Sequence, residues 1–285
     1  MRRASWWLAL PGLAALLAFH FVPIGLGGYY AFTDWDGTNA SWLGLDNFRE
    51  IARDDATRGA LRHTLLLAVC FVVLVNMIGL ALALGLNRAV KSRHLLRSLF
   101  FAPVAVSPLA IGFIWLWIFD YQGALNRLLD GVGLSSLKHA WLGDPSTAIW
   151  TILVVLVWQF AGLAMVLYLA GLQAISDDVY EATLVDGASS WFRLRKVVLP
   201  LLAPAMTVSA TMTLVIGLRV FDQVMAMTGG GPVTATETLT TQVYKQTFVL
   251  GRFGYGASLA LVLTALIAGL ALTQLALLRR NEERL

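Results

Sequence analysis

The segment SDDVYEATLVDGASSWFRLRKVVLPLLAP, residues 176–204, is a polar stretch in a chain otherwise built of long apolar runs. It carries four acidic and three basic side chains and lies between apolar runs at 147–173 and 200–222. Each run is long enough to cross the hydrocarbon core of a bilayer, which takes about 20 apolar residues in a helix. The polar segment therefore connects two spans at a membrane surface.

The first half of this segment has the pattern of a short helix. The hydroxyl of Ser176 can cap its N-terminus, and Asp177 and Asp178 suit the positive end of the helix dipole. Gly187 offers the left-handed conformation that ends helices at low cost, so we predict a helix that ends at residue 185 or 186. Such a short helix is unstable alone. It therefore packs either into the groove of a partner protein or onto lipid, and the residues favour neither.

The second half predicts another short helix after a tight turn. Ser189 or Ser190 can cap it, and it can run through Trp191 and Leu194. We expect the helix to stop at Leu199–Pro200, with Pro200 in the first turn of the next span. The whole segment is thus predicted to be a helix, a turn and a helix.

The rest of the chain predicts an all-α membrane protein with six transmembrane helices. Of its 285 residues, 58% are hydrophobic and only 13% are charged, far from the balance of a soluble domain. The apolar runs lie at 6–32, 63–87, 98–119, 147–173, 200–222 and 254–278. The first run stays apolar past Pro23 to Phe32, too long for the apolar core of a signal peptide, so we interpret it as a retained anchor.

The distribution of Lys and Arg predicts the orientation of the chain. On one side, the loops and ends hold Arg2, Arg3, Arg88, Lys91, Arg93, Arg97, Arg193, Arg195, Lys196, Arg279, Arg280 and Arg284. Basic residues outnumber acidic ones there, whereas the opposite loops carry more acidic residues. Both termini and the 176–200 segment are therefore predicted to be cytoplasmic. Topology also explains the net charge of +4, so no nucleic-acid partner is expected.

The sequence EATLVDGASSWFRLRKVVLP, residues 181–200, resembles the EAA loop of ABC-importer permeases. That pattern reads E-A-A-x-x-x-G, nine residues, then I-x-L-P. Thr183 stands where a second Ala is usual, and Leu194 stands where Phe is common. The resemblance implies a coupling helix that sits in a cleft of a separate ATPase subunit. Its ATPase-coupling residues would be Tyr180, Glu181, Ala182, Thr183, Asp186, Gly187 and Ala188.

Three further stretches resemble carbohydrate-uptake permeases, in particular the first permease component of the maltose type: 42–51, 140–148 and 220–239. The resemblance implies a multi-pass permease of the inner (plasma) membrane that moves a di- or oligosaccharide, or a related polyol, by ATP-driven alternating access. It also implies four kinds of partner: a homologous second permease, an ATPase dimer that binds ATP and Mg, an extracytoplasmic sugar-binding protein, and membrane lipid.

The same resemblance divides the chain into three parts. Residues 1–60 would form the first transmembrane helix and an external loop. Residues 61–280 would form the permease core, with the coupling loop at 176–200, and residues 281–285 a cytoplasmic tail.

Candidate residues for the substrate path come from the third, fourth and fifth core helices, which hold the sugar contacts of maltose-type relatives. The matching positions include Gln159, Phe160, Thr213, Gly217 and Val220, of which only Gln159 and Thr213 are polar, so this chain supplies few of the sugar contacts. We add Arg219 and Asp222 because charge inside a span is costly and is usually functional or paired. Three residues apart on one helix, these two can pair. A role in the path and an ordinary interfacial pair are both open.

Nothing in the sequence predicts catalysis or a bound cofactor or metal in this chain. The TGGGP stretch at 228–232 lacks the Gly-Lys-Ser/Thr of a phosphate loop, so we expect ATP hydrolysis in another subunit and a structural turn here. The four His residues are scattered rather than at ligand spacing. The alternatives are an ion-coupled secondary transporter, and an importer of another solute such as a glycerol phosphate.

Overall fold

The computed structural model describes residues 10–87, 92–176, 178–179, 183 and 187–282. The regular elements of this part are helices, with one isolated β-bridge between Thr33 and Trp42. The chain divides into two compact units, Met1–Arg58 with Leu239–Leu266, and Gly59–Thr238 with Ile267–Leu285. Helices α4 (Asp55–Leu86) and α15 (Phe253–Glu282) each run from one unit into the other.

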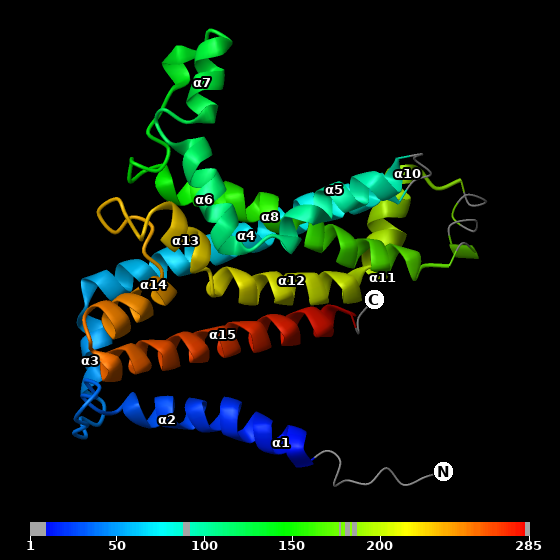
Figure 1. Ribbon diagram of the computed structural model, residues 1–285. Helices are drawn as coiled ribbons and strands as arrows, with labels where there is room; N and C mark the ends of the chain where they lie inside the picture. The colour runs from blue at the N-terminus through cyan, green and yellow to red at the C-terminus, as the bar shows by residue number, and fades with distance from the viewer. Residues whose placement is uncertain (1–9, 88–91, 177, 180–182, 184–186, 283–285) are drawn as a thin grey trace, which may run out of the picture. The chain divides into compact units, whose positions relative to one another are not determined.

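The first unit begins with a long apolar helix. Its parts are α1 (Leu10–Leu16), a π-helical turn (Leu17–Phe21) and α2 (Val22–Tyr30). A short helix, α3 (Asp46–Arg53), follows a loop, and the unit is completed by α14 (Leu239–Tyr244), a π-helical turn (Lys245–Val249) and the start of α15. These elements appear in blue and orange in Figure 1.

Polar side chains hold the loops of the first unit in place. The side-chain amide of Asn47 donates to the carbonyl oxygens of Ala31 (3.1 Å) and Thr33 (2.8 Å). The Arg252 guanidinium donates to both carboxylate oxygens of Glu50, at 2.7 and 2.8 Å. Both contacts come from one nitrogen, Nη2, and are charge-assisted, which makes them stronger than hydrogen bonds between neutral groups. They fasten α3 to the chain that precedes α15.

The second unit contains the main apolar core, which is centred on α8 (Ala148–Gln173). This helix packs against α5 (Arg93–Ala105) and α12 (Ala203–Leu218), and Figure 1 shows the three helices lying lengthwise together. Ile152, Leu156 and Met165 of α8 are fully buried. Apolar residues lie all round the helix rather than on one stripe, as expected of a membrane-spanning helix.

The remaining elements of the second unit are short. They are α6 (Pro108–Phe119), α7 (Ala124–Gly131), a 3-10 turn (Ser135–Leu137), α10 (Ser190–Arg193), a π-helical turn (Leu194–Val198), α11 (Leu199–Leu201) and α13 (Asp222–Met227). Helix α6 packs against α13 and continues toward α7, which projects from the unit in Figure 1.

Membrane-spanning helices are found near most of the predicted positions. Five stretches of the described chain are long and apolar enough to cross a bilayer: Leu10–Tyr30, Asp55–Leu86, Pro108–Gly131, Ala148–Gln173 and Phe253–Arg279. A sixth is the pair Ser190–Leu201 and Ala203–Leu218, bent by 67°. The described structure thus confirms the all-α fold with up to six spans.

Two of the predicted spans differ from the structure. The run at 98–119 is broken in two, because α5 ends at Ala105 and Val106 and Ser107 are extended, with ψ of 140° and 132°. The ring of Pro108 disfavours a helical conformation in the residue before it. The run at 200–222 ends early, since α12 stops at Leu218. The length of the apolar runs did not reveal the break at 106–107, and it placed the end of the second run too far along the chain.

Candidate functional site

The predicted coupling loop is described in part. Tyr180, Glu181, Ala182 and Asp186 lie outside the described residues, whereas Thr183, Gly187 and Ala188 lie within them. The amide of Ala188 donates to the carbonyl of Thr183 (3.1 Å), and Gly187 has φ of +67°. This left-handed residue is the one expected to end the first helix. A Cβ at Gly187 would meet open space, so its conformation rather than its size favours glycine.

The second helix of the loop begins as predicted and ends later than predicted. The hydroxyl of Ser189 accepts a hydrogen bond from the amide of Phe192 (3.3 Å), which makes Ser189 the cap. The helix does not stop at Leu199–Pro200. It continues to Leu201 through the π-helical turn, and Pro204, like Pro200, occupies the first turn of a helix. Because proline lacks only an amide that the first turn leaves unpaired, the chain tolerates both residues.

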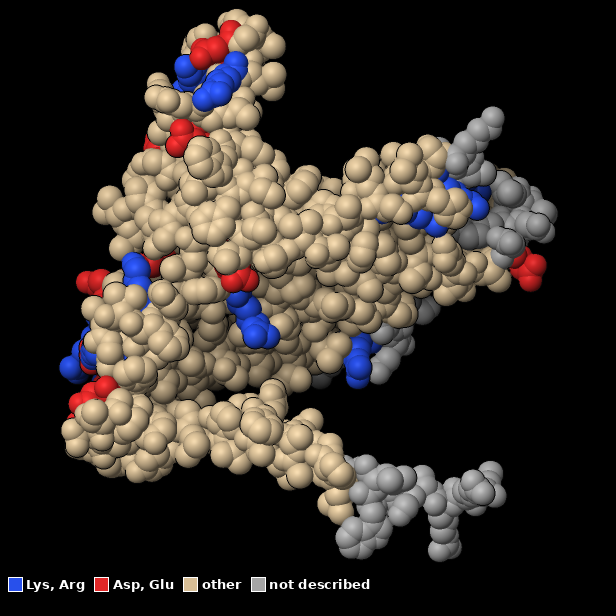
Figure 2. Space-filling view, viewed as in Figure 1, with Lys and Arg blue, Asp and Glu red and all other residues tan. Residues whose placement is uncertain are grey.

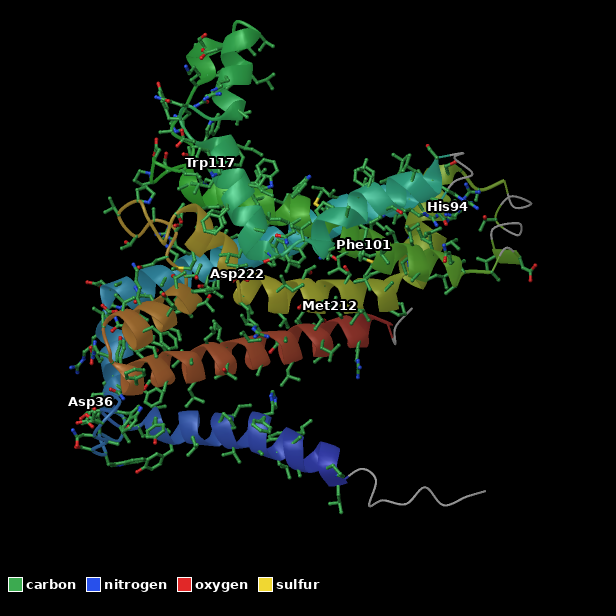
Figure 3. The ribbon with its side chains drawn as sticks, viewed as in Figure 1. Asp36, His94, Phe101, Trp117, Met212 and Asp222 are labelled. Carbon is green, nitrogen blue, oxygen red and sulfur yellow. The ribbon has the colours of Figure 1, made fainter. Side chains whose placement is uncertain are left out.

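A cavity of about 260 Å³ lies where the start of α6 and the middle of α8 meet the junction of α12 and α13. Four predicted path residues line this cavity: Phe160, Arg219, Val220 and Asp222. Figure 3 shows Asp222 at this junction. The remaining lining residues are Pro108, Leu156, Val215, Ile216, Phe221 and Gln223. The cavity therefore has an apolar wall and a few polar groups at one end.

Arg219 and Asp222 do not form the predicted pair on one helix. Arg219 is the residue after α12, and Asp222 is the first residue of α13, with a turn between them where Phe221 has φ of −135°. No ion pair joins their side chains in the part of the chain that the structure describes. The break in the helix removes the three-residue spacing on which the expectation depended, and both groups face the cavity instead.

Gln159 is fully buried next to the cavity. Its side-chain oxygen accepts a hydrogen bond from the side-chain amide of Gln223 (2.8 Å). The side-chain nitrogen of Gln159 lies 3.5 Å from the carbonyl oxygen of Val106. Gln159 thus links α8 to α13 and to the break between α5 and α6. Sequence analysis did not find Gln223, because its partner lies 64 positions away.

The structure does not bring Thr213 and Gly217 to the cavity. The hydroxyl of Thr213 accepts from the amide of Asn76 (2.9 Å) and donates to the carbonyl of Ser209 (2.8 Å). Gly217 packs against α4, where a Cβ would come within 3.0 Å of the Cα of Ala68. Both residues therefore lie in helix contacts.

Asn76 is the centre of a buried polar network that joins α4, α8 and α12. Its side-chain oxygen accepts hydrogen bonds from the hydroxyls of Tyr168 and Ser209, both at 2.7 Å. Its amide donates to the carbonyl of Val72 (2.8 Å) and to Thr213. Polar groups away from water are stable only with partners, and this network supplies them. Tyr168 and Ser209 were not predicted, because the sequence does not indicate the hydrogen-bond partner of a single polar residue in an apolar run.

The TGGGP stretch forms a compact turn that bonds to itself. The hydroxyls of Thr228 and Thr236 lie 2.7 Å apart, and Thr236 donates to the carbonyl of Gly231 (2.6 Å). Gly230 has φ of +93° and approaches the side chain of Glu237 so closely that a Cβ would lie 3.0 Å from it. This arrangement agrees with the structural role expected for the glycines.

Comparison with known proteins identifies the family. Residues 59–282 match the model of the binding-protein-dependent transport system inner membrane component. The chain belongs to this family. The permease thus spans the membrane several times as a component of a transport system. The resemblance to sugar ABC-importer permeases is thereby confirmed.

Similar proteins match the permease along nearly its whole length. A probable starch degradation products permease of Thermoanaerobacterium thermosulfurigenes is 34% identical, over 97% of this chain and 94% of that protein. A multiple sugar-binding transport system permease of Streptococcus mutans is 31% identical, over 98% and 96%. A trehalose/maltose transport system permease of Thermococcus litoralis is 31% identical, over 96% and 92%.

Solved structures support the fold. A chain of a bacterial ABC transporter involved in the import of alginate superimposes with a TM-score of 0.85 at 22% identity, over 96% of this chain and 94% of that chain. A chain of an amino acid ABC transporter gives a TM-score of 0.53 at 18% identity, over 84% and 99%. The helical arrangement is therefore that of ABC-transporter permeases.

Proposed function

We propose that this permease is the membrane-spanning subunit of an importer that moves a di- or oligosaccharide, or a related polyol, by ATP-driven alternating access. The observation that carries the proposal is the family match over residues 59–282, together with relatives named for starch products, multiple sugars and trehalose/maltose. The assembly would contain a homologous second permease, an ATPase dimer and an extracytoplasmic sugar-binding protein. ATP and Mg would bind the ATPase, and this chain would hold neither.

The coupling loop would act as a lever in this assembly. The residues from Tyr180 to Ala188 would sit in a cleft of the ATPase and move with it. Three features of the chain support this role: the left-handed Gly187, the cap at Ser189, and the continuous helical path from Ser190 to Leu201. A short element held at both ends transmits a displacement, whereas a flexible loop absorbs it.

The cavity beside Arg219 would form part of the sugar path. The ring of Phe160 offers an apolar face, and Arg219, Asp222 and Gln223 offer hydrogen-bonding groups. Ligand sites usually combine a mostly apolar lining with a few polar groups, in volumes of about 300–1,000 Å³. At about 260 Å³ this cavity is small for a disaccharide, so the second permease would complete the site.

An anionic solute such as a glycerol phosphate is a second candidate, because Arg219 has no ion-pair partner among the described residues. The replacement Arg219→Gln separates the two classes. If the solute is neutral, it lowers uptake modestly and equally for all substrates; if the solute is a phosphate ester, it selectively abolishes that uptake.

Uptake into proteoliposomes that contain this permease, the second permease and the co-purified ATPase, with the sugar-binding protein added outside, tests the main proposal. We expect labelled maltodextrins or trehalose to accumulate only with ATP inside, and Gly187→Pro to abolish accumulation. Gly187→Asn is the matched control, since Asn tolerates the left-handed conformation and keeps its amide donor. Uptake without the ATPase, driven by a proton gradient, would instead establish an ion-coupled secondary transporter.

A further inference from the structure

A second pocket, of about 490 Å³, lies at the end of α4 and α8 where α10 begins. Its aliphatic lining residues are Leu84, Leu172, Leu194 and Val198. These residues come from the last turns of two membrane spans and from the π-helical turn after α10. Leu172 and Val198 belong to the buried core, at 2% and 4% exposed, whereas Leu84 and Leu194 are partly exposed.

The remaining lining residues are polar, basic or aromatic. They are Asn87, Ser190, Arg193 and Trp191, whose side chain is 69% exposed. Arg193 is half-buried and forms no ion pair with any described residue. Because no described residue neutralises this half-buried guanidinium, it can form a charge-assisted hydrogen bond to an anion from outside the chain.

A second guanidinium lies next to the pocket. Arg97 donates to the carbonyl of Leu86 at 2.8 Å, between the lining residues Leu84 and Asn87. Its Nε atom is buried and has no hydrogen-bond partner among the described residues. Figure 2 shows basic side chains gathered at this end of the unit, around α5 and α10. Asp178 is the one acidic residue described between residues 176 and 200, and it is exposed.

This combination fits one kind of ligand better than a soluble anion. A free phosphate ion would use the arginines but leave the partly exposed Leu84 and Leu194 and the exposed Trp191 uncovered. A phospholipid can contact both groups of residues, since its headgroup is charged and its chains are apolar. Tryptophan favours the interface between hydrocarbon and water. Basic pockets between spans at the cytoplasmic side bind the headgroups of anionic lipids.

We propose that the pocket binds an anionic phospholipid of the cytoplasmic leaflet. Its phosphate binds Arg193, with Arg97 close by at Leu86, and the first carbons of its chains lie against Leu84 and Leu194. Because Arg193 belongs to the second helix of the coupling loop, the lipid holds that helix against the ends of α4 and α8. The inference requires a membrane-spanning chain and does not depend on which solute is carried.

The experiment measures lipid retained by the assembled transporter. The complex is first placed in nanodiscs made of equal parts phosphatidylglycerol and phosphatidylcholine. It is then transferred into detergent and washed, and the lipid that stays bound is identified from the mass of the complex by native mass spectrometry. We expect phosphatidylglycerol to be retained over phosphatidylcholine, and Arg193→Gln to lower its retention about five-fold, the effect of one arginine near an anionic surface. Arg195→Gln removes the same charge two residues away, at an exposed position outside the pocket, and is expected to change nothing.

Other outcomes would overturn the proposal. Equal retention of the two lipids, or equal loss in both variants, would show that the pocket does not select a headgroup. Protection against thermal unfolding by inorganic phosphate alone would assign the site to a free anion. Loss of the ATPase from Arg193→Gln with lipid retention unchanged would assign Arg193 to the ATPase interface. Arg97→Lys keeps the positive charge and should therefore retain phosphatidylglycerol. Loss of the lipid from Arg97→Lys as well would indicate misfolding rather than loss of the charge.

Discussion

At the scale of the residue, Gln159 and Gln223 show how a polar pair survives in an apolar core. Both side chains are almost completely buried, at 1% and 4% exposed, and their amide groups meet at 2.8 Å. Replacing either glutamine by an apolar residue would leave the side chain of the other without this hydrogen-bond partner. A buried polar group that loses its partner costs about 1–3 kcal/mol, whereas removing both partners is nearly neutral.

We therefore expect Gln159→Leu to lower the free energy of unfolding by about 1–3 kcal/mol, and Gln159→Leu with Gln223→Leu to recover most of this loss. Thermal unfolding of the purified permease in detergent measures both. Additive losses in the double variant would contradict the pairing.

Asp36, in the loop that precedes α3, has its pKa lowered to about 2. The backbone amides of Asn39 and Thr38 and the hydroxyl of Thr38, all at 2.8 Å from the carboxylate, stabilise its charged form. A lowered pKa means that the carboxylate stabilises the fold fully above its usual pKa of 3.8. The contribution is lost as the pH falls through about 2.

Titration of ¹³C-labelled aspartate in nanodiscs should accordingly show a midpoint near 2 for Asp36. Thr38→Val should raise this midpoint only in part, because the two backbone donors remain. A midpoint that does not move in Thr38→Val would show that the hydroxyl contributes nothing.

At the scale of the element, close approach between helices depends on glycine. A Cβ at Gly162 of α8 would overlap the carbonyl oxygen of Phe100 in α5. Small residues let the backbones of membrane helices approach in this way. In contrast, a Cβ at Gly85 of α4 would meet nothing within 4 Å.

Gly162→Ala should therefore destabilise the permease by about 1–3 kcal/mol, the usual cost of overpacking. The matched control Gly85→Ala should be neutral or slightly stabilising, because alanine favours the helix interior. Unfolding in mixed micelles at increasing SDS compares the two. Equal effects of the two substitutions would mean that α5 and α8 move apart to accommodate the added methyl group without loss of stability.

The network around Asn76 is a second contact between elements. Tyr168→Phe removes one of the two hydroxyls that donate to the side-chain oxygen of Asn76 and leaves the other in place. We expect a loss of about 0.6 kcal/mol, typical of a hydrogen bond between membrane helices. Asn76→Leu removes the partner of Tyr168, Ser209 and Thr213 together and should cost more than Tyr168→Phe, by the same SDS titration. The reverse order would contradict the central position of Asn76.

The sequence allowed the spans to be predicted but not where two of them break. Pro103 and Pro108 are both signals of a helix end, yet Pro103 lies inside α5, which continues past it, whereas α6 starts at Pro108. Neighbouring helices can satisfy the carbonyl that a proline leaves unpaired, and sequence does not reveal those neighbours. The capping serine and Gly187 were predictable because their effects are local. Tyr168 lies 92 positions from Asn76, and Ser209 lies 133, so no local pattern connects them.

At the scale of the whole molecule, the charge pattern sets the orientation of the permease. The proposed coupling loop could reach the proposed ATPase subunit only if residues 176–200 face the cytoplasm, as the Lys and Arg distribution predicts. The chain has a single cysteine, Cys70, half-buried in α4. Replacing Cys70 leaves the chain without cysteine. A single cysteine introduced into a loop then shows, by its labelling, on which side of the membrane that loop lies.

In a Cys70→Ala background, we expect Thr38→Cys to react with a membrane-impermeant maleimide in intact cells. Lys196→Cys should react only after the membrane is opened. Mass shift of the purified protein on gels measures both. Labelling of Lys196→Cys in intact cells would reverse the orientation and remove the coupling role.

The extended residues between α5 and α6 have a consequence for mutational surveys. The acceptor that faces Gln159 there is the carbonyl of Val106, a group that every amino acid possesses. Alanine scanning of residues 104–107 would leave that oxygen in place and report the region as dispensable. Pro108→Ala, which favours a continuous helix, would instead remove the free carbonyl of Val106. Such a change would show that the backbone supplies the hydrogen-bond acceptor for Gln159.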